Sequence, residues 1–285
     1  NPDINETCCA YNLLKLTRDL NCYNPDDARY MDYYERVLYN QIIGSLNPEH
    51  YQTCYQYAVG LNATKPFGNE TPQSTCCGGT GSENHTKYQE AAYFVNDNSL
   101  FVTLYIPTTP ARQEKGIKIV QDCLWPAESS KISIVEGKGK FTLKLRVPYW
   151  ATAGFTVKLN AKTIATNCQP STYYSVERKW KKGDVIEVEM PFTKYINYGA
   201  DKLTSDVASA DGVQLDDAWV GTLMYGPLAM TGTDAMTWSD ATLNIDSHLD
   251  NITANRPTKD SGVNGNIYTL TVNGQTFQPD YYRSN

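Results

Sequence analysis

The spacing of apolar residues changes near residue 95, and this change restricts the chain to a fold in which helices precede strands. Upstream of that point apolar residues recur every three to four positions. This spacing predicts three helices, over residues 7–20, 25–44 and about 82–93. The chain therefore begins with a helical part that must bury one face of each helix.

Residue types at the ends of these segments predict where the helices begin and stop. Asn24 is expected to cap the second helix, since a proline and two aspartates follow it, and Gly44 is expected to end that helix. In the first helix, Tyr11, Leu14 and Leu20 are expected to form the buried stripe.

Downstream of residue 95 the pattern has period two, which is typical of strands with one buried and one solvated face. The segments with this pattern are 101–106, 141–147, 185–190 and 219–230. Asn273-Gly274 between two apolar segments predicts a hairpin. The polar segment from Tyr198 to Asp217 is predicted to be a long loop.

These patterns predict an α+β multidomain fold. Residues 1–94 are expected to form a helical domain and residues 95–197 an antiparallel β-sandwich. Residues 198–285 are expected to form a second β-sandwich or a continuation of the first. A chain of 285 residues with 41% apolar and 20% charged residues is suited to one large domain or several smaller ones.

The charge and hydropathy patterns exclude two classes of partner. The net charge is −6, and the lysines and arginines do not cluster, so a nucleic-acid partner is not expected. No apolar segment approaches the roughly 18 residues that a membrane helix needs, so a membrane span is not expected either.

The eight cysteines are too few to build a disulfide scaffold of this size, and four of them form two vicinal pairs. A disulfide between neighbours in sequence is strained, so vicinal cysteines favour free thiols or metal ligands. The remaining four are expected to be small buried apolar residues: Cys22, Cys54, Cys123 and Cys168.

Two short segments contain residue types that bind metals. Glu6 and Cys8 lie two positions apart at an expected helix start, where both side chains can converge on one point. Glycines follow Cys76 and Cys77 and let the backbone bend, so both thiols can reach one ion. Three thiolates and a carboxylate form a ligand set suited to zinc. Buried apolar cysteines are the alternative.

Other candidate residues have simpler interpretations. Glu35, Glu83 and His85 are each explained equally well as residues on a helix face. The chain contains no Gly-x-Ser-x-Gly motif, so a serine hydrolase is not indicated.

Several short motifs follow one another along the chain. They are E-T-C (6–8), D-Y-Y-E-R-V-L-Y-N (32–40), T-C-Y (53–55), C-C-G-G-T-G-S-E-N-H-T-K-Y (76–88), L-Y-I-P (104–107), L-R-V-P-Y-W (145–150), W-K-K-G-D (180–184) and Y-G-P-L (225–228). Taken in this order, they resemble glycoside hydrolase families 127 and 146, the β-L-arabinofuranosidases. The resemblance covers about the first 230 residues, and the double-cysteine motif with its glycines is its most specific part.

The resemblance implies a fold and a reaction. The helical part would be the C-terminal portion of an (α/α)6 barrel, followed by antiparallel β-sandwich domains. The reaction would be hydrolysis of terminal β-L-arabinofuranosides with retention, in oligo- or polysaccharides of plant origin, through a zinc-bound cysteine. A role in polysaccharide breakdown favours the bacterial periplasm or the exterior over the cytoplasm.

The resemblance also assigns residues. Glu6, Cys8 and Cys77 would bind Zn²⁺, and Cys76 would be both a zinc ligand and the nucleophile. The sugar-contacting positions of the family correspond to Glu35 and Tyr55. Its acid/base glutamate lies upstream of the E-T-C motif, so this chain alone is expected to lack it. The expected partner is therefore the remaining N-terminal part of the same enzyme.

Two alternatives remain open from the sequence. One is a glycosidase with the same scaffold but another sugar specificity. The other is a non-catalytic carbohydrate-binding or structural β-sandwich protein, which would need no zinc at its cysteines.

Overall fold

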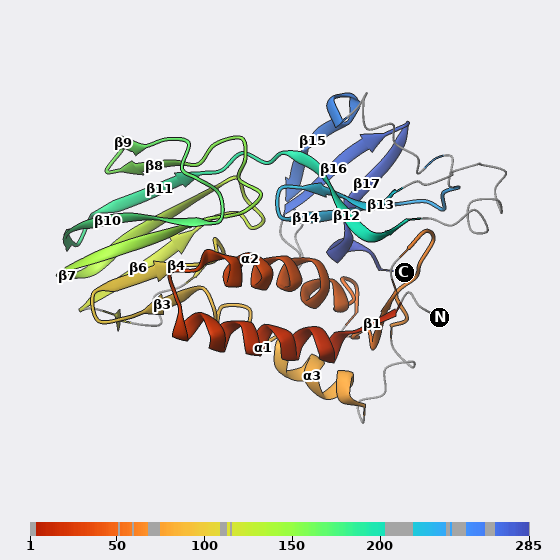
Figure 1. The fold of residues 1–285 in the computed structure, drawn as a ribbon, viewed down its shortest axis with the longest axis horizontal. Helices are drawn as coiled ribbons and strands as arrows, with labels where there is room; N and C mark the ends of the chain where they lie inside the picture. Colours follow the sequence, from red (N-terminus) through yellow and green to blue (C-terminus); the bar gives the residue numbers. More distant parts are fainter. Residues whose placement is uncertain are drawn as a thin grey trace. The chain divides into compact units, whose positions relative to one another are not determined.

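The structure is a computed structural model that describes residues 4–50, 52–58, 60–67, 75–108, 113–114, 116–202, 219–237, 240, 249–259 and 266–284. The chain contains helices as well as sheets, as the sequence predicts, and it forms two compact units (Figure 1). Unit 1 comprises Asn1–Ala10, Tyr39–Ser82 and Lys194–Asn285, and unit 2 comprises Tyr11–Leu38 and Glu83–Thr193. The predicted domain boundaries at residues 94 and 197 stay predictions, and so does the (α/α)6 barrel.

Helix α1 (Thr7–Tyr23) begins where the sequence predicts, but its buried stripe differs from the expected one. Tyr11 and Leu14 are buried, whereas Leu20 is 40% exposed and Asn21 is fully buried. Two helical turns separate residue 14 from residue 21, so the stripe reaches the asparagine instead of the leucine. Leu20 was therefore wrongly assigned to the core.

Helix α2 (Ala28–Val37) starts three residues later than predicted, and its cap is Asp27 instead of Asn24. The carbonyl of Asn24 accepts a hydrogen bond from the Asp27 amide at 3.2 Å, which closes a turn before the helix. The Asp27 carboxylate then accepts from the Arg29 amide at 3.1 Å. After α2 the chain continues as one π-helical turn (Leu38–Ile42) and one 3₁₀ turn (Ile43–Ser45), close to the predicted stop at Gly44.

The predicted third helix is misplaced by several residues. The structure has α3 at Cys76–Asn84, and β3 (Tyr93–Val95) follows where the helix was expected to end. The glycines after Cys77, which were expected to let the backbone bend, lie inside α3. Glycine is a poor helix former, so local sequence does not favour a helix here, and packing holds it.

The sheet of unit 2 is organised around one long strand, β7 (Ser129–Val147). Its first half pairs with β6 and β11, and its second half pairs with β10 and, in parallel, with β4. The other strands of this sheet are β3, which pairs with β4, and β4 (Ser99–Val102), β5 (Gln113–Glu114), β6 (Ile117–Asp122), β8 (Thr156–Leu159), β9 (Lys162–Ala165), β10 (Thr172–Lys181) and β11 (Val185–Glu189). One strand thus contributes to two sets of pairings.

A glycine permits the change of partners along β7. Gly137 has φ of +84°, and a Cβ at this position would lie 2.1 Å from the carbonyl oxygen of Gly116. Only glycine fits here, because any side chain would collide with the neighbouring backbone. Alternating residues on both halves of β7 are buried, among them Ile132, Ile134 and Leu143.

The predicted strand at residues 101–106 is shorter than expected. β4 ends at Val102, yet Leu104 and Ile106 remain buried. The side-chain amide of Gln121 donates hydrogen bonds to the carbonyls of Leu104 at 2.8 Å and Ile106 at 2.6 Å. A buried side chain therefore satisfies backbone groups that a sheet ladder would otherwise pair.

Unit 1 contains an antiparallel sheet of six strands in the order β12-β13-β14-β17-β16-β15. Their bounds are β12 Lys194–Lys202, β13 Trp219–Tyr225, β14 Leu228–Gly232, β15 Thr253–Lys259, β16 Asn266–Val272 and β17 Gln275–Pro279. The predicted hairpin is confirmed, with φ of +49° at Asn273 and +80° at Gly274. The predicted loop is wrong up to Lys202, which belongs to β12, and the rest of it lies outside the described residues.

Short elements complete unit 1. β1 (Ile4–Glu6) pairs with β2 (Gln56–Ala58), and two 3₁₀ turns lie at Leu249–Asn251 and Asp280–Tyr282. The second turn is held by a buried ionic cluster, in which Lys65 Nζ lies 3.3 Å and Arg283 Nε 3.2 Å from the two carboxylate oxygens of Asp280. In the part of the chain that the structure describes, no helix is both long and apolar enough to cross a membrane.

Candidate metal and catalytic site

The two cysteine segments meet in unit 1, although almost 70 residues separate them in sequence. The sulfur atoms of Cys8, Cys76 and Cys77 all lie within 4.8 Å of one another, and those of Cys8 and Cys76 are 3.5 Å apart. The Glu6 carboxylate is 3.5 Å from the sulfur of Cys8. All eight cysteines are free thiols, so the vicinal pairs form no disulfide. The four predicted ligands are thus brought together around Cys8.

The first arm of the site is the junction between β1 and α1. Glu6 ends β1, whose ladder with β2 is extended by the Thr7 amide donating to the Tyr55 carbonyl at 3.1 Å. The chain turns into α1 at Thr7, so Glu6 and Cys8 lie on either side of the junction. Glu6 also accepts a hydrogen bond from the Tyr55 hydroxyl at 3.2 Å, which fixes the carboxylate.

The second arm is the start of α3, with Cys76 and Cys77 in its first turn. The hydroxyl of Thr75 accepts a hydrogen bond from the Gly78 amide at 3.1 Å, as a helix N-cap does. The same helix packs tightly against Thr53, because a Cβ on Gly81 would lie 2.9 Å from the methyl carbon of that threonine. Gly81 therefore allows α3 to pack closely against Thr53.

The start of each helix favours negative charge on the sulfurs. The Cys8 amide, at the beginning of α1, donates to the Cys77 sulfur at 3.3 Å, and helix N-termini stabilise thiolates. A hydrogen bond from Cys8 lowers the pKa of Cys76, with the Tyr55 hydroxyl contributing in the same direction. Burial raises the pKa values of Cys8 and Cys77. Cys76 is therefore the thiol of the three that deprotonates most readily.

The donor set fits a metal ion. A tetrahedral zinc with sulfur ligands at ~2.3 Å requires sulfurs separated by about 3.8 Å. The 3.5 Å between Cys8 and Cys76 is close to that separation. A second group of potential ligands comprises Glu6, Cys8 and Cys9, which also lie within 4.8 Å of one another. Cys9 was missed at the sequence level, although its position next to Cys8 was a usable signal.

Exposure distinguishes the thiols. Cys76 is exposed, whereas Cys8 is 8% and Cys77 only 1% exposed. An incoming molecule can therefore reach the sulfur of Cys76 more easily than either neighbour. Tyr55 lies beside it, with 3.9 Å between the Cys76 sulfur and the Tyr55 hydroxyl oxygen. Hydrogen bonding with Cys76 and Glu6 raises the pKa of Tyr55 to about 12, so its phenol stays protonated at neutral pH.

The structure does not bring Glu35 to the cysteines. Glu35 belongs to unit 2, where it is 1% exposed and accepts hydrogen bonds from Arg146 at 2.6 Å and Trp150 at 2.8 Å. Burial raises the pKa of Glu35, and the positive charge of Arg146 opposes that shift. Both carboxylate oxygens of Glu35 are engaged with protein groups, and the sugar contact of this residue stays a prediction.

The other candidates also have structural partners. Glu83 accepts hydrogen bonds from Tyr11 at 3.0 Å and Lys87 at 2.6 Å, so it anchors the end of α3 to α1 within unit 2. His85 follows α3 instead of lying on a helix, and its Nδ1 is 2.5 Å from the Tyr88 hydroxyl. Of the cysteines expected in the core, Cys54 is buried, Cys123 and Cys168 are half-buried and Cys22 is exposed.

Comparisons with known proteins identify two domain models that match the chain. A model of the β-L-arabinofuranosidase GH127 catalytic domain matches residues 2–90, and a model of the GH127 middle domain matches residues 99–192. No curated protein matches the chain significantly.

Solved structures share the fold over almost the whole chain. They include a GH127 β-arabinofuranosidase (22% identity, TM-score 0.72), a glycoside hydrolase (19%, 0.70) and a GH127 β-L-arabinofuranosidase from Geobacillus stearothermophilus T6 (20%, 0.69). The alignments cover 98%, 99% and 99% of this chain but 47%, 50% and 48% of the others. This chain thus spans about half the length of the structures that it matches.

Proposed function

Because the chain belongs to the GH127 β-L-arabinofuranosidase family, whose catalytic and middle domains it matches, we propose that it carries the nucleophile of a retaining glycoside hydrolase that releases terminal β-L-arabinofuranose. The observation that carries this proposal is the cluster of three thiols and one carboxylate in unit 1, with one thiol exposed. A plain carbohydrate-binding module has no need of such a cluster. Two of the structural neighbours are β-arabinofuranosidases, which supports the choice of sugar.

The proposed cofactor is one zinc ion, held by Glu6, Cys8, Cys76 and Cys77. Zinc would keep the thiolates deprotonated at neutral pH and would temper the basicity of the sulfur. Carboxylate and thiolate are both normal zinc ligands, and a set with three sulfurs favours zinc over magnesium or calcium. Cys9 is the alternative fourth ligand, since it shares the group formed by Glu6 and Cys8.

The proposed reaction has two displacements at the anomeric carbon. The sulfur of Cys76 forms a bond to this carbon while the bond to the leaving oxygen breaks, and a general acid protonates that oxygen. Water, deprotonated by the same group, then forms a new carbon–oxygen bond and releases the Cys76 thiolate. Two inversions give net retention. The protonated Tyr55 hydroxyl, 3.9 Å from the Cys76 sulfur, is the proposed contact to the sugar.

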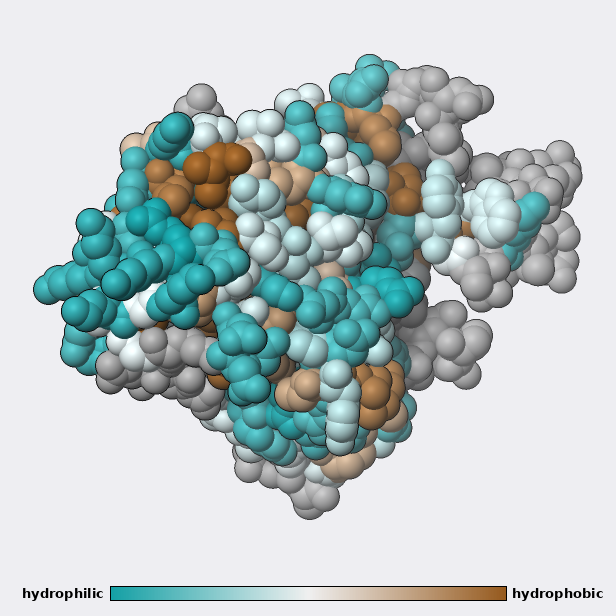
Figure 2. All heavy atoms as spheres, turned by 60° about the vertical axis from the view of Figure 1, so that its left-hand side comes forward, coloured by the Kyte–Doolittle hydropathy of each residue, from teal (hydrophilic) through white to brown (hydrophobic). Residues whose placement is uncertain are grey.

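The general acid and the walls of the sugar site are proposed to come from the remaining N-terminal part of the enzyme. An exposed apolar stripe on α1 in unit 2 is consistent with such a partner. Its residues follow helical spacing and are 40–89% exposed: Leu13, Leu16, Leu20 and Tyr23. The face drawn in Figure 2 is mainly hydrophilic, with separate hydrophobic patches between the polar residues. A helical domain covering this stripe would bury apolar area that is now in water.

The stereochemistry of the product tests the proposal. Proton NMR of the full-length enzyme acting on an aryl β-L-arabinofuranoside is expected to show the β-anomer of arabinose first. Mass spectrometry of the quenched reaction is expected to locate a pentosyl adduct on the peptide that contains Cys76. An α-anomeric first product, or an adduct on a carboxylate, would overturn the proposal. Turnover of another sugar in preference would support the alternative specificity instead.

A further inference from the structure

We propose that the segment Thr53–Tyr55, here called the brace, sets the distance between the two arms of the site, and that Thr7 and Gly81 are the positioning residues through which it acts. The inference rests on the metal site proposed above, but it concerns residues that bind no metal themselves. Thr53 packs against α3, whereas Cys54 and Tyr55 accept hydrogen bonds from Thr7.

The brace holds the first arm through Thr7. This residue is 1% exposed, and its hydroxyl donates a buried hydrogen bond of 2.8 Å to the carbonyl of Cys54. Its amide donates to the carbonyl of the next brace residue, Tyr55. Thr7 lies between Glu6 and Cys8, so a shift of its backbone moves the carboxylate and the thiol together.

The brace holds the second arm through α3. A Cβ on Gly81 would lie 2.9 Å from the methyl carbon of Thr53, which is closer than real Cβ contacts come, and 3.0 Å from its hydroxyl oxygen. The helix can therefore approach the brace this closely only with glycine at position 81. Gly79 lies in the same helix, but a Cβ there would meet nothing within 4 Å.

The geometry of a metal site makes this distance important. The ligands on the two arms must lie within a few tenths of an ångström of the ideal positions for one ion. Groups that orient ligands typically contribute 10- to 100-fold to metal affinity. Both arms contact the same three-residue brace, so displacing either arm changes the separation of Cys8 from Cys76 and Cys77.

The first experiment removes the Thr7 hydroxyl in the full-length protein. Thr7→Val is expected to weaken zinc binding by about 10-fold or more, measured by competition with a chelating dye, while Thr7→Ser is expected to retain it. Thr103→Val is the matched control. Thr103 is also fully buried and donates its hydroxyl to a backbone carbonyl, that of Ala91, but it lies in unit 2. The Thr103→Val substitution is expected to lower the melting temperature without changing zinc affinity.

The second experiment adds one methyl group to α3. Gly81→Ala is expected to weaken zinc binding by about 10-fold. Gly79→Ala adds the same methyl group to the same helix and is expected to leave zinc affinity unchanged. Combining Gly81→Ala with Thr53→Ala removes the colliding atoms, so part of the affinity is expected to return. The absorption of the Co²⁺-loaded protein reports whether all thiolates still bind the ion.

The outcomes separate this inference from the proposed function. If the parent protein and its Cys77→Ser variant bind zinc equally, the proposed metal site itself is wrong. If the parent binds zinc through its cysteines but Thr7→Val and Gly81→Ala retain its affinity within twofold, the brace is wrong and the site stands. If Thr103→Val or Gly79→Ala lost as much zinc affinity as Thr7→Val and Gly81→Ala, the effect would be a general one on the fold. This result would also overturn the inference.

Discussion

Cys76 differs from its neighbours in being exposed while its sulfur lies among two buried thiols. We expect Cys76→Ser in the full-length enzyme to reduce turnover by roughly 10³-fold or more, because a serine hydroxyl is far less nucleophilic than a thiolate. Loss of one ligand out of four should weaken zinc binding without unfolding the protein. Steady-state kinetics and circular dichroism of the purified variant measure the two effects.

Cys123→Ser provides the control for this substitution. Cys123 is half-buried in unit 2, and its thiol donates to the carbonyl of Tyr105 at 3.5 Å. A serine hydroxyl can make the same hydrogen bond, so turnover is expected to stay close to that of the parent. Comparable loss of turnover in both variants would contradict the assignment of Cys76.

His85 gives the stability of the protein a dependence on pH. Burial lowers the pKa of His85 from 6.5 to about 4. The folded state therefore favours the neutral ring of His85. This preference contributes fully to the stability of the fold above pH 6.5, and the contribution is lost as the pH falls towards 4. The free energy of unfolding of the parent should fall by up to about 3 kcal/mol more than that of His85→Gln over this interval.

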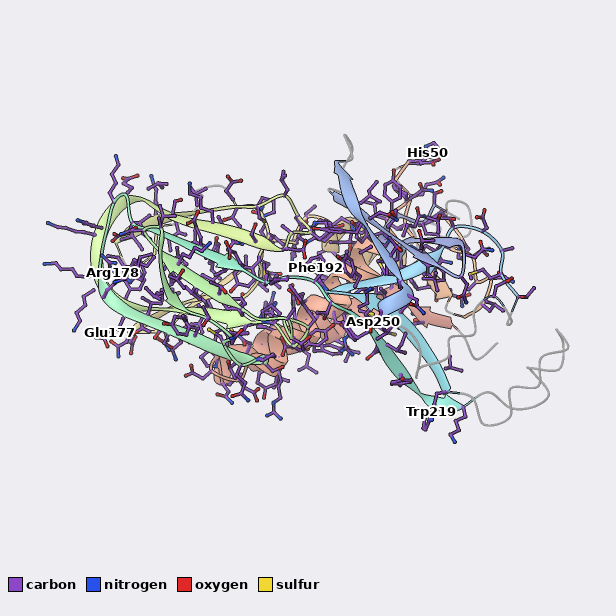
Figure 3. All side chains as sticks on the ribbon, turned by 90° about the horizontal axis from the view of Figure 1, so that it is seen from above. His50, Glu177, Arg178, Phe192, Trp219 and Asp250 are labelled. Atoms are coloured by element: carbon purple, nitrogen blue, oxygen red, sulfur yellow. The ribbon has the colours of Figure 1, made fainter. Side chains whose placement is uncertain are left out.

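Urea denaturation at several pH values between these limits measures the difference. His50→Gln is the matched control, because His50 is exposed at the periphery of the molecule (Figure 3). The free energy of unfolding of His50→Gln is expected to change with pH as that of the parent does. Parallel pH profiles for the parent and His85→Gln would show that the pKa of His85 is the same in the folded and unfolded states.

The residues of the site could be predicted only as far as their chemistry is local. Thiols and a carboxylate are residue types suited to zinc, so Glu6, Cys8, Cys76 and Cys77 could be grouped in advance as a candidate ligand set, with buried apolar cysteines as the alternative. The burial of Glu35 could not be predicted, since its partner Arg146 lies 111 residues further along the chain. A helical pattern shows which face is polar, but it does not show what will cover that face.

At the scale of elements, helix α2 is fixed to the sheet of unit 2 through one buried arginine. Arg146 of β7 is fully buried and pairs with Asp32 and Glu35 of α2, each at 2.6 Å. Burial alone would lower the pKa of Arg146, but the two carboxylates outweigh it and raise the value. We expect Arg146→Met to destabilise the fold by about 3–5 kcal/mol, since it leaves two buried carboxylates without a cation.

Chemical denaturation of three variants tests this expectation. Replacing both carboxylates by amides, as Asp32→Asn with Glu35→Gln, in the Arg146→Met background is expected to recover part of the loss. Lys140→Met is the control. Its partner Glu177 lies at the outer edge of the strands of unit 2 in Figure 3, and both side chains are more than 60% exposed, so about 1 kcal/mol or less is expected. Equal effects at the exposed and buried positions would contradict the role of Arg146.

Elements with a strong local pattern could be predicted, whereas those defined by packing could not. The alternation along β7 and the Asn273-Gly274 hairpin are local signals, and both are present in the structure. Helix α3 consists largely of glycine, serine and threonine, which are poor helix formers. It is held by its cap at Thr75 and by its contact with Thr53, and neither contact follows from helix propensity.

At the scale of the whole molecule, the chain is half as long as the enzymes that it resembles. We expect residues 1–285 alone to turn over an aryl β-L-arabinofuranoside at least ~10²-fold more slowly than the full-length enzyme. A general acid accounts for roughly 10²–10⁴-fold in rate, and the proposed acid lies outside these residues. Parallel assays of the two purified proteins at equal zinc concentration measure the ratio.

Turnover by residues 1–285 at the full-length rate would show that the acid lies within them. The four-carboxylate set Glu6, Asp32, Glu35 and Glu83 would then be replaced one at a time in residues 1–285. A pH profile that loses its alkaline limb in one variant would identify the acid. Such a result would also contradict the proposed dependence on an N-terminal partner.

The interleaving of the two units has a consequence for how such a gene can change. The chain passes between the units at residues 10/11, 38/39, 82/83 and 193/194, so neither unit is a continuous stretch of sequence. A recombination breakpoint between the two matched domains, at residues 91–98, would deliver Arg146 to one descendant and both of its carboxylates to the other. Each descendant would inherit a buried charge without its counterpart. Exchange of the catalytic domain alone should therefore be selected against, and the two domains should be inherited as a pair.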